Sequence, residues 1–245
     1  MIYKLPRTFA APAKVTVAIT TYPKYHQYLQ LALASIDFAH TEVLVINDSC
    51  DIPIKVQGKH VTVINRTESK PWYAGRARNI AWQHCTTDNI IFLDGDDVFF
   101  PGAIEAMYWY QNDIFERTGE RHIIYGNLIR TDMNKVWQVN KQYRGTDVNS
   151  SPVFAANSVM PYLCLIPVKV LEQIGGYVTD DYIPTWEDLV FEADLWLHNV
   201  KATRINIITY IYRWSTDGRR GSNDTSDIRA AVQAFMYDRY KRSKR

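Results

Sequence analysis

The sequence has few cysteines, no long hydrophobic run and almost no net charge. Cys50, Cys85 and Cys164 are widely spaced, so they form neither a disulfide framework nor a zinc-binding pattern, and they suit a reducing compartment. No apolar run approaches the length of a transmembrane helix, and segment 1–14 lacks the apolar core of a signal peptide. A net charge of +2 argues against a broad nucleic-acid-binding surface on the body of the protein. These absences predict a cytoplasmic protein and leave peripheral association with a membrane open.

What is present is enough apolar material for a sizeable core. The 245 residues are 47% hydrophobic and 13% aromatic, so one domain, or one domain with a small appendage, is expected. The end of the chain, residues 239–245, is strongly basic. Such an end is either a solvated tail or a contact for a membrane surface or a nucleic acid.

Strand and helix signals alternate in the first half of the chain. Runs of β-branched and apolar residues predict strands, and apolar residues at helical spacing predict the helices between them. The predicted strands are 15–21, 42–47, 61–64 and 89–93, and the predicted helices are 25–36, 74–84 and 101–117. This alternation predicts an α/β fold with a mainly parallel sheet and helices on its faces.

The pattern changes after Gly119. A hairpin is predicted over 122–131 and 135–140, followed by a polar loop over 140–157 of the kind that often forms a binding lid. Strands are then predicted at 159–166 and 203–212, and helices at 168–174 and 186–198.

The strongest candidate site is the acidic cluster Asp94, Asp96 and Asp97, which follows the apolar run 90–93. That run predicts a buried strand, so the carboxylates emerge together at its carboxyl end, where open α/β sheets bind ligands. Oxygen ligands favour Mg²⁺ or Mn²⁺, which commonly bind through carboxylates and substrate phosphates. The alternative is a solvated turn in which Asp96 or Asp97 caps the helix after Pro101.

Polar residues also follow two other predicted strands. Thr21 and Tyr22 come after the first strand, and Asp48 comes after the second. In a parallel sheet these positions share an edge with the acidic cluster, so one ligand could touch all of them. A ring and a carboxylate there suit a nucleobase and a ribose, although each motif alone is also typical of an ordinary turn.

Two further motifs place charge at predicted helix starts. Arg76 and Arg78 point in different directions on a helix, so at most one of them, preferably Arg78, faces a ligand phosphate; the alternative is a solvated basic face. Glu187 and Asp188 open another helix, where the helix dipole alone favours acids. The functional interpretation is that one of the two acids is a general base.

The order of these motifs resembles that of the inverting family 2 glycosyltransferases of the GT-A type. The matching motifs are Thr21-Tyr22, Asn47-Asp48-Ser49, Ala74-Gly75 with Ala77-Arg78-Asn79, Leu93 to Asp97, Gly175-Gly176-Tyr177 and Glu187-Asp188. The resemblance implies a GT-A domain over 15–222, between an N-terminal segment 1–14 and a C-terminal helix and basic tail 223–245. Its mainly parallel nucleotide-binding sheet would carry helices on both faces and a smaller acceptor-side subregion.

The resemblance also implies an activity: inverting transfer of a sugar from a nucleotide diphosphate sugar, with a UDP-sugar as the first expectation. Asp48 would contact the base, Asp94 the ribose, and Asp96 an Mn²⁺ or Mg²⁺ ion that bridges the diphosphate. Asp188 would be the general base, with Glu187 beside it. The acceptor would be a glycan or a lipid-linked glycan, with a protein or a nucleic acid as alternatives.

The chain departs from the family pattern at two places. Asn47 replaces an acid, which weakens the implied contact to the base. The run 212–215 lacks a histidine that many relatives carry after the last strand. The loop that follows offers Asp217 as a metal ligand, and Arg219 and Arg220 as contacts to the diphosphate, or it is a polar loop without such a role.

Two rival functions stay open. A nucleotidyltransferase would also use paired acids and a metal, but its Gly-rich phosphate loop is missing after the first predicted strand, where the sequence reads Thr20-Thr21-Tyr22-Pro23. A catalytically inactive carbohydrate- or nucleic-acid-binding protein is the second rival.

Overall fold

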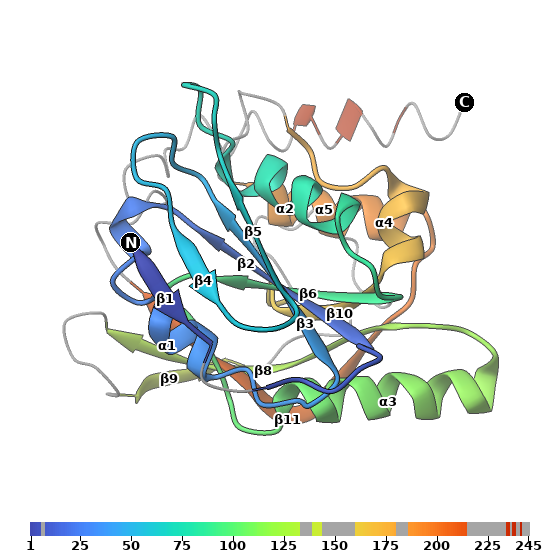
Figure 1. Ribbon diagram of the computed structural model, residues 1–245. Coiled ribbons are helices and arrows are strands. Elements are labelled where there is room, and N and C mark those ends of the chain that lie inside the picture. Colours follow the sequence, from blue (N-terminus) through green and yellow to red (C-terminus); the bar gives the residue numbers. More distant parts are fainter. Residues whose placement is uncertain are drawn as a thin grey trace.

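A nine-stranded sheet forms the centre of the molecule. The structure, a computed structural model, describes residues 1–5, 8–132, 139–143, 160–179 and 186–214, with positions 234, 235, 237, 238 and 241 near the C-terminus. The strands of the sheet lie in the order β5-β3-β2-β6-β10-β8-β11-β7, and β9 pairs with β8 outside this path. Helices lie above and below the sheet (Figure 1).

The first four strands of this order are parallel. They are β5 (Val61–Asn65), β3 (Thr41–Asn47), β2 (Val15–Thr21) and β6 (Asn89–Asp94). β2, β3 and β6 are almost entirely buried, as expected for strands that are covered on both faces. The predicted parallel half of the sheet is therefore confirmed.

Alternate residues of these strands enter two separate cores. Ala18, Leu44 and Phe92 belong to the core under α2 (Tyr73–Gln83), α4 (Val168–Ile174) and α5 (Glu187–Leu197). Their neighbours along the strands belong to the core under α1 (Leu29–Ala34) and α3 (Ala103–Thr118). The two-residue period of a strand thus places a helix layer on each face of the sheet.

The second half of the sheet is mixed. β10 (Cys164–Pro167) runs antiparallel to both β6 and β8 (Ile123–Asp132). β11 (Ala202–Trp214) is parallel to β8 and antiparallel to β7 (Val98–Phe99), and β9 (Val139–Tyr143) completes a hairpin with β8. Because β7 follows the acidic cluster directly, its pairing with β11 brings this strand close to that cluster.

Several predicted boundaries are wrong. The helix predicted over 25–36 is a 3-10 turn, η1 (Pro23–Tyr25), followed by the shorter α1. The strand predicted over 159–166 begins only at Cys164. The second hairpin strand lies at 139–143, so the first residues of the predicted loop 140–157 are strand, and residues 144–159 lie outside the described part.

A small parallel pair, β1 (Ile2–Lys4) and β4 (Lys55–Gln57), and the strand β7 were not predicted at all. Strands of two or three residues show no periodicity, so nothing in the sequence marks them. Leu5 and Phe9, from the predicted N-terminal segment 1–14, are buried in the core under α1 and α3.

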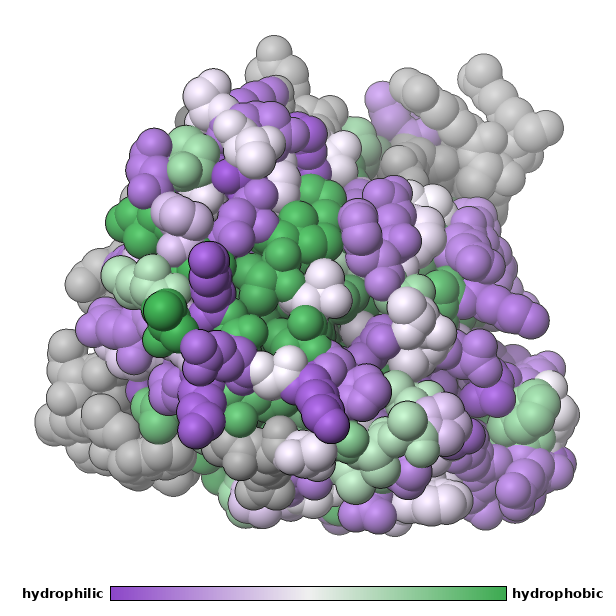
Figure 2. Space-filling model, viewed as in Figure 1, coloured by the Kyte–Doolittle hydropathy of each residue, from purple (hydrophilic) through white to green (hydrophobic). Residues whose placement is uncertain are grey.

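Hydrophobic and hydrophilic residues are unevenly distributed over the surface. In the view of Figure 1, hydrophobic residues gather in the middle of the face, and hydrophilic residues surround them (Figure 2). Among the described residues, no helix has both the length and the apolar character needed to cross a bilayer.

Candidate active site

The polar ends of β2, β3 and β6 meet at one edge of the sheet. Thr21 is the register partner of Asn47 on β3, and Thr20 is the partner of Asp94 on β6. The parallel register therefore brings the residues after all three strands together, as the sequence predicts. The predicted ligands Thr21, Tyr22, Asp48 and Asp94 all lie at or next to this edge.

The turn that carries the acidic cluster packs in close contact with the end of β2. Gly95 donates its backbone N–H to Thr20 at 2.8 Å, and a Cβ at this position would lie 2.6 Å from Thr21 Oγ1. Thr20 Oγ1 donates to Asp94 Oδ1 at 3.0 Å. Glycine is thus required at this turn because two strands approach closely, and the turn orders Asp94 at the sheet edge.

The three acids have unequal environments. The Asp94 side chain is 31% exposed, whereas Asp96 is 5% exposed and Asp97 is fully buried. Burial and the neighbouring Asp94 raise the pKa of Asp96 to about 8, and burial, Asp96 and Asp94 raise the pKa of Asp97 well above its usual value. Crowded, buried carboxyl groups of this kind are stabilised by a cation, because it would offset their mutual repulsion.

The capping alternative for Asp97 is wrong. Asp97 Oδ1 accepts a hydrogen bond from the backbone N–H of Arg213 at 2.7 Å, so it ties β11 to the turn. The helix α3 begins after Gly102, whose N–H donates to Asp37 Oδ2 at 2.6 Å, and none of the cluster's acids caps it. The buried carboxyl of Asp97 therefore has a structural role, because it joins the turn that carries Asp94 and Asp96 to β11.

The donor set suits a hard cation, although no complete metal site lies within the described residues. There, no group of three His, Cys, Asp or Glu side chains is close enough to hold an ion. Asp94 and Asp96 supply two neighbouring carboxylates. Mg²⁺ usually binds one or two carboxylates of a protein when substrate phosphates provide other ligands. The third predicted ligand, Asp217, and the predicted phosphate contacts Arg219 and Arg220 lie outside the described part of the chain.

Sequence reasoning missed the basic residues beside these acids. Lys24 and Arg213 both lower the pKa of Asp96 through their charges. The buried guanidinium of Arg213 also lies over the ring of Tyr28, 4.9 Å from its centroid. Lys24 lies in the turn η1, three residues after the end of β2, a position that the strand-end argument could have included.

An aromatic pair stands at the end of β2. The rings of Tyr22 and Tyr25 lie 4.4 Å apart and are tilted by 59°, because the 3-10 turn η1 places residues three apart on one side. Burial and the charge of Asp96 raise the pKa of the Tyr25 hydroxyl. Tyr25 was not among the predicted site residues, and its spacing from Tyr22 was the available signal. Thr21 is buried beside them, and its hydroxyl finds no hydrogen-bond partner in the described structure.

Asp48 is engaged with the start of α2. Its two carboxylate oxygens accept hydrogen bonds from the backbone N–H groups of Trp72 and Tyr73 at 2.8 and 3.1 Å, and Arg66 Nε lies 2.7 Å from Oδ1. Tyr73 has a left-handed backbone, with φ of 55°. The carboxylate thus holds a helix start that has no side-chain cap of its own, while the predicted contact to a base stays a prediction.

Asn47 belongs to a buried amide network. Its Oδ1 lies 2.8 Å from His26 Nε2, and its Nδ2 donates to the carbonyl of Ile52 and to Asn65 Oδ1. Where the family usually has an acid, this chain therefore places a neutral side chain whose donors and acceptor are all used. Asn47 thus has a structural role at the end of β3.

Arg78 points toward the strand ends, and Arg76 does not. Arg78 Nη1 lies 2.7 Å from Glu187 Oε1, and Nη2 lies 3.3 Å from Asp94 Oδ1. Arg76 pairs with Glu68 and its side chain is 46% exposed. Of the two arginines, only Arg78 therefore lies against the strand-end acid Asp94, which it joins to Glu187 of α5. The predicted contact of Arg78 with a ligand phosphate stays a prediction.

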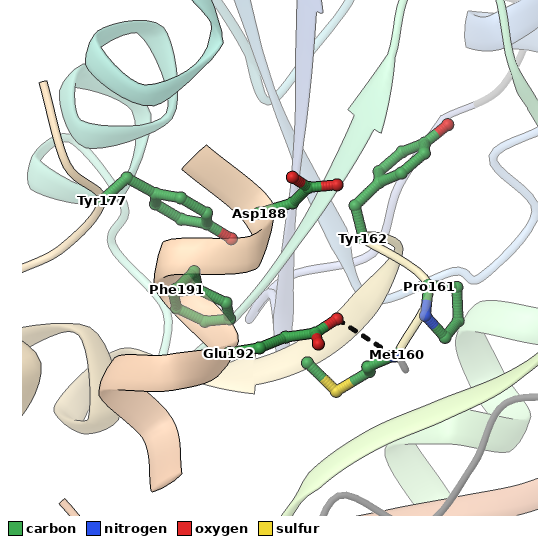
Figure 3. A pocket seen from close by; sticks show the side chains of 7 residues that line it. All are labelled: Met160, Pro161, Tyr162, Tyr177, Asp188, Phe191 and Glu192. Atoms are coloured by element: carbon green, nitrogen blue, oxygen red, sulfur yellow. Dashed lines mark hydrogen bonds between the residues drawn. The ribbon is translucent and has the colours of Figure 1, made fainter. Parts of the chain in front are cut away.

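The two acids of α5 have different surroundings. Glu187 is buried, and burial raises the pKa of its carboxyl to about 7 although Arg78 opposes this shift. Asp188 is partly exposed and lines a small recess. Figure 3 shows this recess between α5 and the chain before β10, and its lining consists of Met160, Pro161, Tyr162, Tyr177, Asp188, Phe191 and Glu192.

A mainly parallel sheet whose carboxyl edge carries an acidic cluster, with a second acidic pair on a facing helix, defines a GT-A-type domain. Residues 16–162 match the description "Glycosyl transferase family 2", and the chain belongs to this family. The predicted fold class and family are confirmed.

The similar proteins agree with this assignment. The chain is 34% identical over 107 residues to the β-1,4 N-acetylgalactosaminyltransferase 1 of Homo sapiens and of Rattus norvegicus, which covers 43% of this chain and 19% of each relative. The chain thus spans about a fifth of the length of these relatives. The solved structure of S. aureus TarS 1-349 in complex with UDP-GlcNAc has a TM-score of 0.63 and 14% identity, covering 91% of this chain and 66% of that one.

Proposed function

We propose that this protein transfers a sugar from a UDP-sugar to an acceptor hydroxyl with inversion at the anomeric carbon. The observation that carries the proposal is the meeting of the two acidic motifs: Asp94 at the end of β6 and Glu187 on α5 share the guanidinium of Arg78. A donor site at the sheet edge and a base on the facing helix are what such a transfer requires. The names of the relatives make UDP-GlcNAc and UDP-GalNAc the first donors to test.

Asp94 and Asp96 would hold the divalent ion, Mn²⁺ or Mg²⁺, together with the donor phosphates. When bound, this ion would neutralise charge on the departing nucleotide diphosphate. Lys24, beside Asp96, is placed to add positive charge on the same side. Tyr22 and Tyr25 offer a pair of rings for the base at the end of β2.

Asp188 is the better candidate for the base. Glu187 is buried against Arg78, whereas Asp188 is partly exposed and lines the recess. Its carboxylate would take the proton of the acceptor hydroxyl while the oxygen forms its bond to the anomeric carbon and the bond to the diphosphate breaks. We propose that the acceptor, whose hydroxyl would approach this carboxylate, is a glycan or a lipid-linked glycan.

Transfer and hydrolysis assays with a panel of UDP-sugars and Mn²⁺ test this function. Asp188→Asn should nearly abolish turnover and leave UDP binding intact, because the amide cannot accept the proton. Asp113→Asn is the matched control, since Asp113 lies exposed on α3 and pairs only with Arg117 in the described structure. Normal turnover in Asp188→Asn would remove Asp188 as the base.

The rivals give different results in the same assays. A nucleotidyltransferase would form UDP-sugars from UTP and a sugar phosphate, and would not transfer the sugar to an acceptor. An inactive binding protein would bind a glycan or nucleic acid without turnover of any donor. If no nucleoside diphosphate raises the melting temperature in the presence of Mn²⁺, the donor-site proposal fails, because a ligand of the native state stabilises it.

A further inference from the structure

Arg78 occupies an unusual position for a residue that was predicted to contact phosphate. The residue is 2% exposed, and its guanidinium carbon lies over two rings, 5.6 Å from the centroid of Tyr162 and 5.4 Å from that of Tyr177. A phosphate-binding arginine has to present its donors to a ligand at the surface of the site. Here the guanidinium is instead buried among protein side chains.

Both terminal nitrogens of Arg78 are used by carboxylates from different motifs. Nη1 donates to Glu187 Oε1 at 2.7 Å, and Nη2 donates to Asp94 Oδ1 at 3.3 Å. The two acids are 109 and 16 positions away in the chain. One rigid guanidinium therefore sets the separation of the β6 acid and the α5 acid.

Each of the two acids keeps one oxygen that the described structure does not engage. Asp94 receives Thr20 and Arg78 both at Oδ1, so no hydrogen bond within the described residues uses its Oδ2. Glu187 Oε2 is buried and likewise has no partner there. A buried acceptor without a donor is costly, which favours a ligand hydroxyl at this place.

The first turn of α5 depends on the same contact. Its N-cap position, Trp186, makes no side-chain capping hydrogen bond. Glu187 is the first residue of the helix and Asp188 the second, so holding Glu187 also fixes where Asp188 stands. A shift of about 1 Å at a reacting group can lower a rate by about 100-fold.

We propose that Arg78 is a positioning residue that holds Asp94 and Glu187 in register across the donor site, rather than a ligand of the diphosphate. Its guanidinium thus connects the edge of the sheet that would bind the donor with α5, the helix that carries the proposed base. The inference rests on the proposed function for its kinetic readout, but the contacts themselves do not depend on that function.

Arg78→Lys tests the proposal because lysine keeps the charge and cannot reach both carboxylates in one plane. We expect UDP affinity, measured by calorimetry, to be unchanged and kcat for sugar transfer to fall by about 100-fold. Arg76→Lys is the matched control on the same helix and should change neither value. If UDP affinity falls as much as kcat, Arg78 is a phosphate ligand and the proposal is wrong.

Glu187→Gln provides a second variant that does not remove the arginine. Residues that act as a unit are not additive, so Arg78→Lys combined with Glu187→Gln should be no slower than the slower single variant. If the loss of kcat in the double variant equalled the product of the two single losses, the positioning role would be contradicted.

A readout without activity separates this proposal from the proposed function. In thermal melts, the effects of Asp94→Asn and Glu187→Gln should be coupled when Arg78 is present and additive when residue 78 is lysine. Additive effects in the presence of Arg78 would overturn the inference. A wild-type protein that neither binds UDP nor transfers a sugar would overturn the proposed function, whatever the melts show.

Discussion

Asp97 accepts a 2.7 Å hydrogen bond at Oδ1 from the backbone N–H of Arg213, a residue 116 positions later. This bond joins the last acid of the cluster to β11, whose neighbour β7 follows the cluster directly. Asp97 is completely buried and its pKa lies well above the usual value because of burial and the nearby Asp96 and Asp94. The structure behind the donor site thus depends on a carboxyl group that favours its neutral form.

Asp97→Asn should therefore be tolerated better than Asp97→Ala. The neutral amide keeps an acceptor for Arg213, whereas alanine leaves this buried N–H unpaired at a cost of about 1–3 kcal/mol. Urea denaturation of the metal-free protein measures the difference. Equal destabilisation by both substitutions would show that the Arg213 bond does not govern this position.

The metal-free protein should lose stability as the pH rises. The folded state raises the pKa of Asp96 from its ordinary value of 3.8 to about 8, so the contribution of its neutral form is complete below the ordinary value and is lost as the pH approaches 8. Asp96→Asn should flatten the plot of melting temperature against pH, and the exposed control Asp113→Asn should keep the wild-type slope. Mn²⁺ should raise the melting temperature most at the alkaline end, where the carboxyl is ionised.

A profile with the same slope in wild type and Asp96→Asn would contradict this explanation. So would an increase in wild-type stability between about pH 5 and about pH 8, because a raised carboxyl pKa has the opposite sign.

Asp48→Ala should destabilise the fold by about 3–5 kcal/mol, since it leaves the buried Arg66 charge without its carboxylate. The N–H groups of Trp72 and Tyr73 would also lose their acceptor. Asp51→Ala is the control, because Asp51 is an exposed acid in the same loop. Unchanged stability together with weaker UDP binding would instead favour the contact to the base that the resemblance implies.

The adjacent glycines Gly175 and Gly176 allow a matched test of close packing. Both have a left-handed backbone, with φ of 79° and 78°, so alanine at either position costs about 1–2 kcal/mol of backbone strain. Only at Gly176 does a Cβ meet other atoms, at 2.4 Å from Asn79 Oδ1 and 2.8 Å from Trp82 Nε1. Gly176→Ala should therefore unfold at a clearly lower urea concentration than Gly175→Ala, and equal midpoints would refute the packing argument.

Much of the fold was readable from the sequence. The buried strands β2, β3 and β6 could be predicted because each is a run of β-branched and apolar residues between turn signals. The predicted helix start near residue 74 and the stop at Gly119 were close to α2 and α3, because a glycine with a left-handed backbone marks the end of α3. The shortest strands and the start of β10 at Cys164 required the structure, because pairing with distant segments decides them. The start of α1 at Leu29 also required it, since a 3-10 turn comes before the helix.

The candidate site likewise has features that the sequence predicts and features that it does not. Which acids follow which strands can be read from the order of the residues alone, and the parallel register then brings Thr21, Asp48 and Asp94 to one edge. Three contacts, by contrast, emerge only from the fold: Arg78 joins Asp94 to Glu187, Asp97 holds Arg213, and Asp48 holds the start of α2. The reason is physical: a strand's period is written locally in its residues, whereas the partner of a buried charge is set by packing between segments that the chain order leaves far apart.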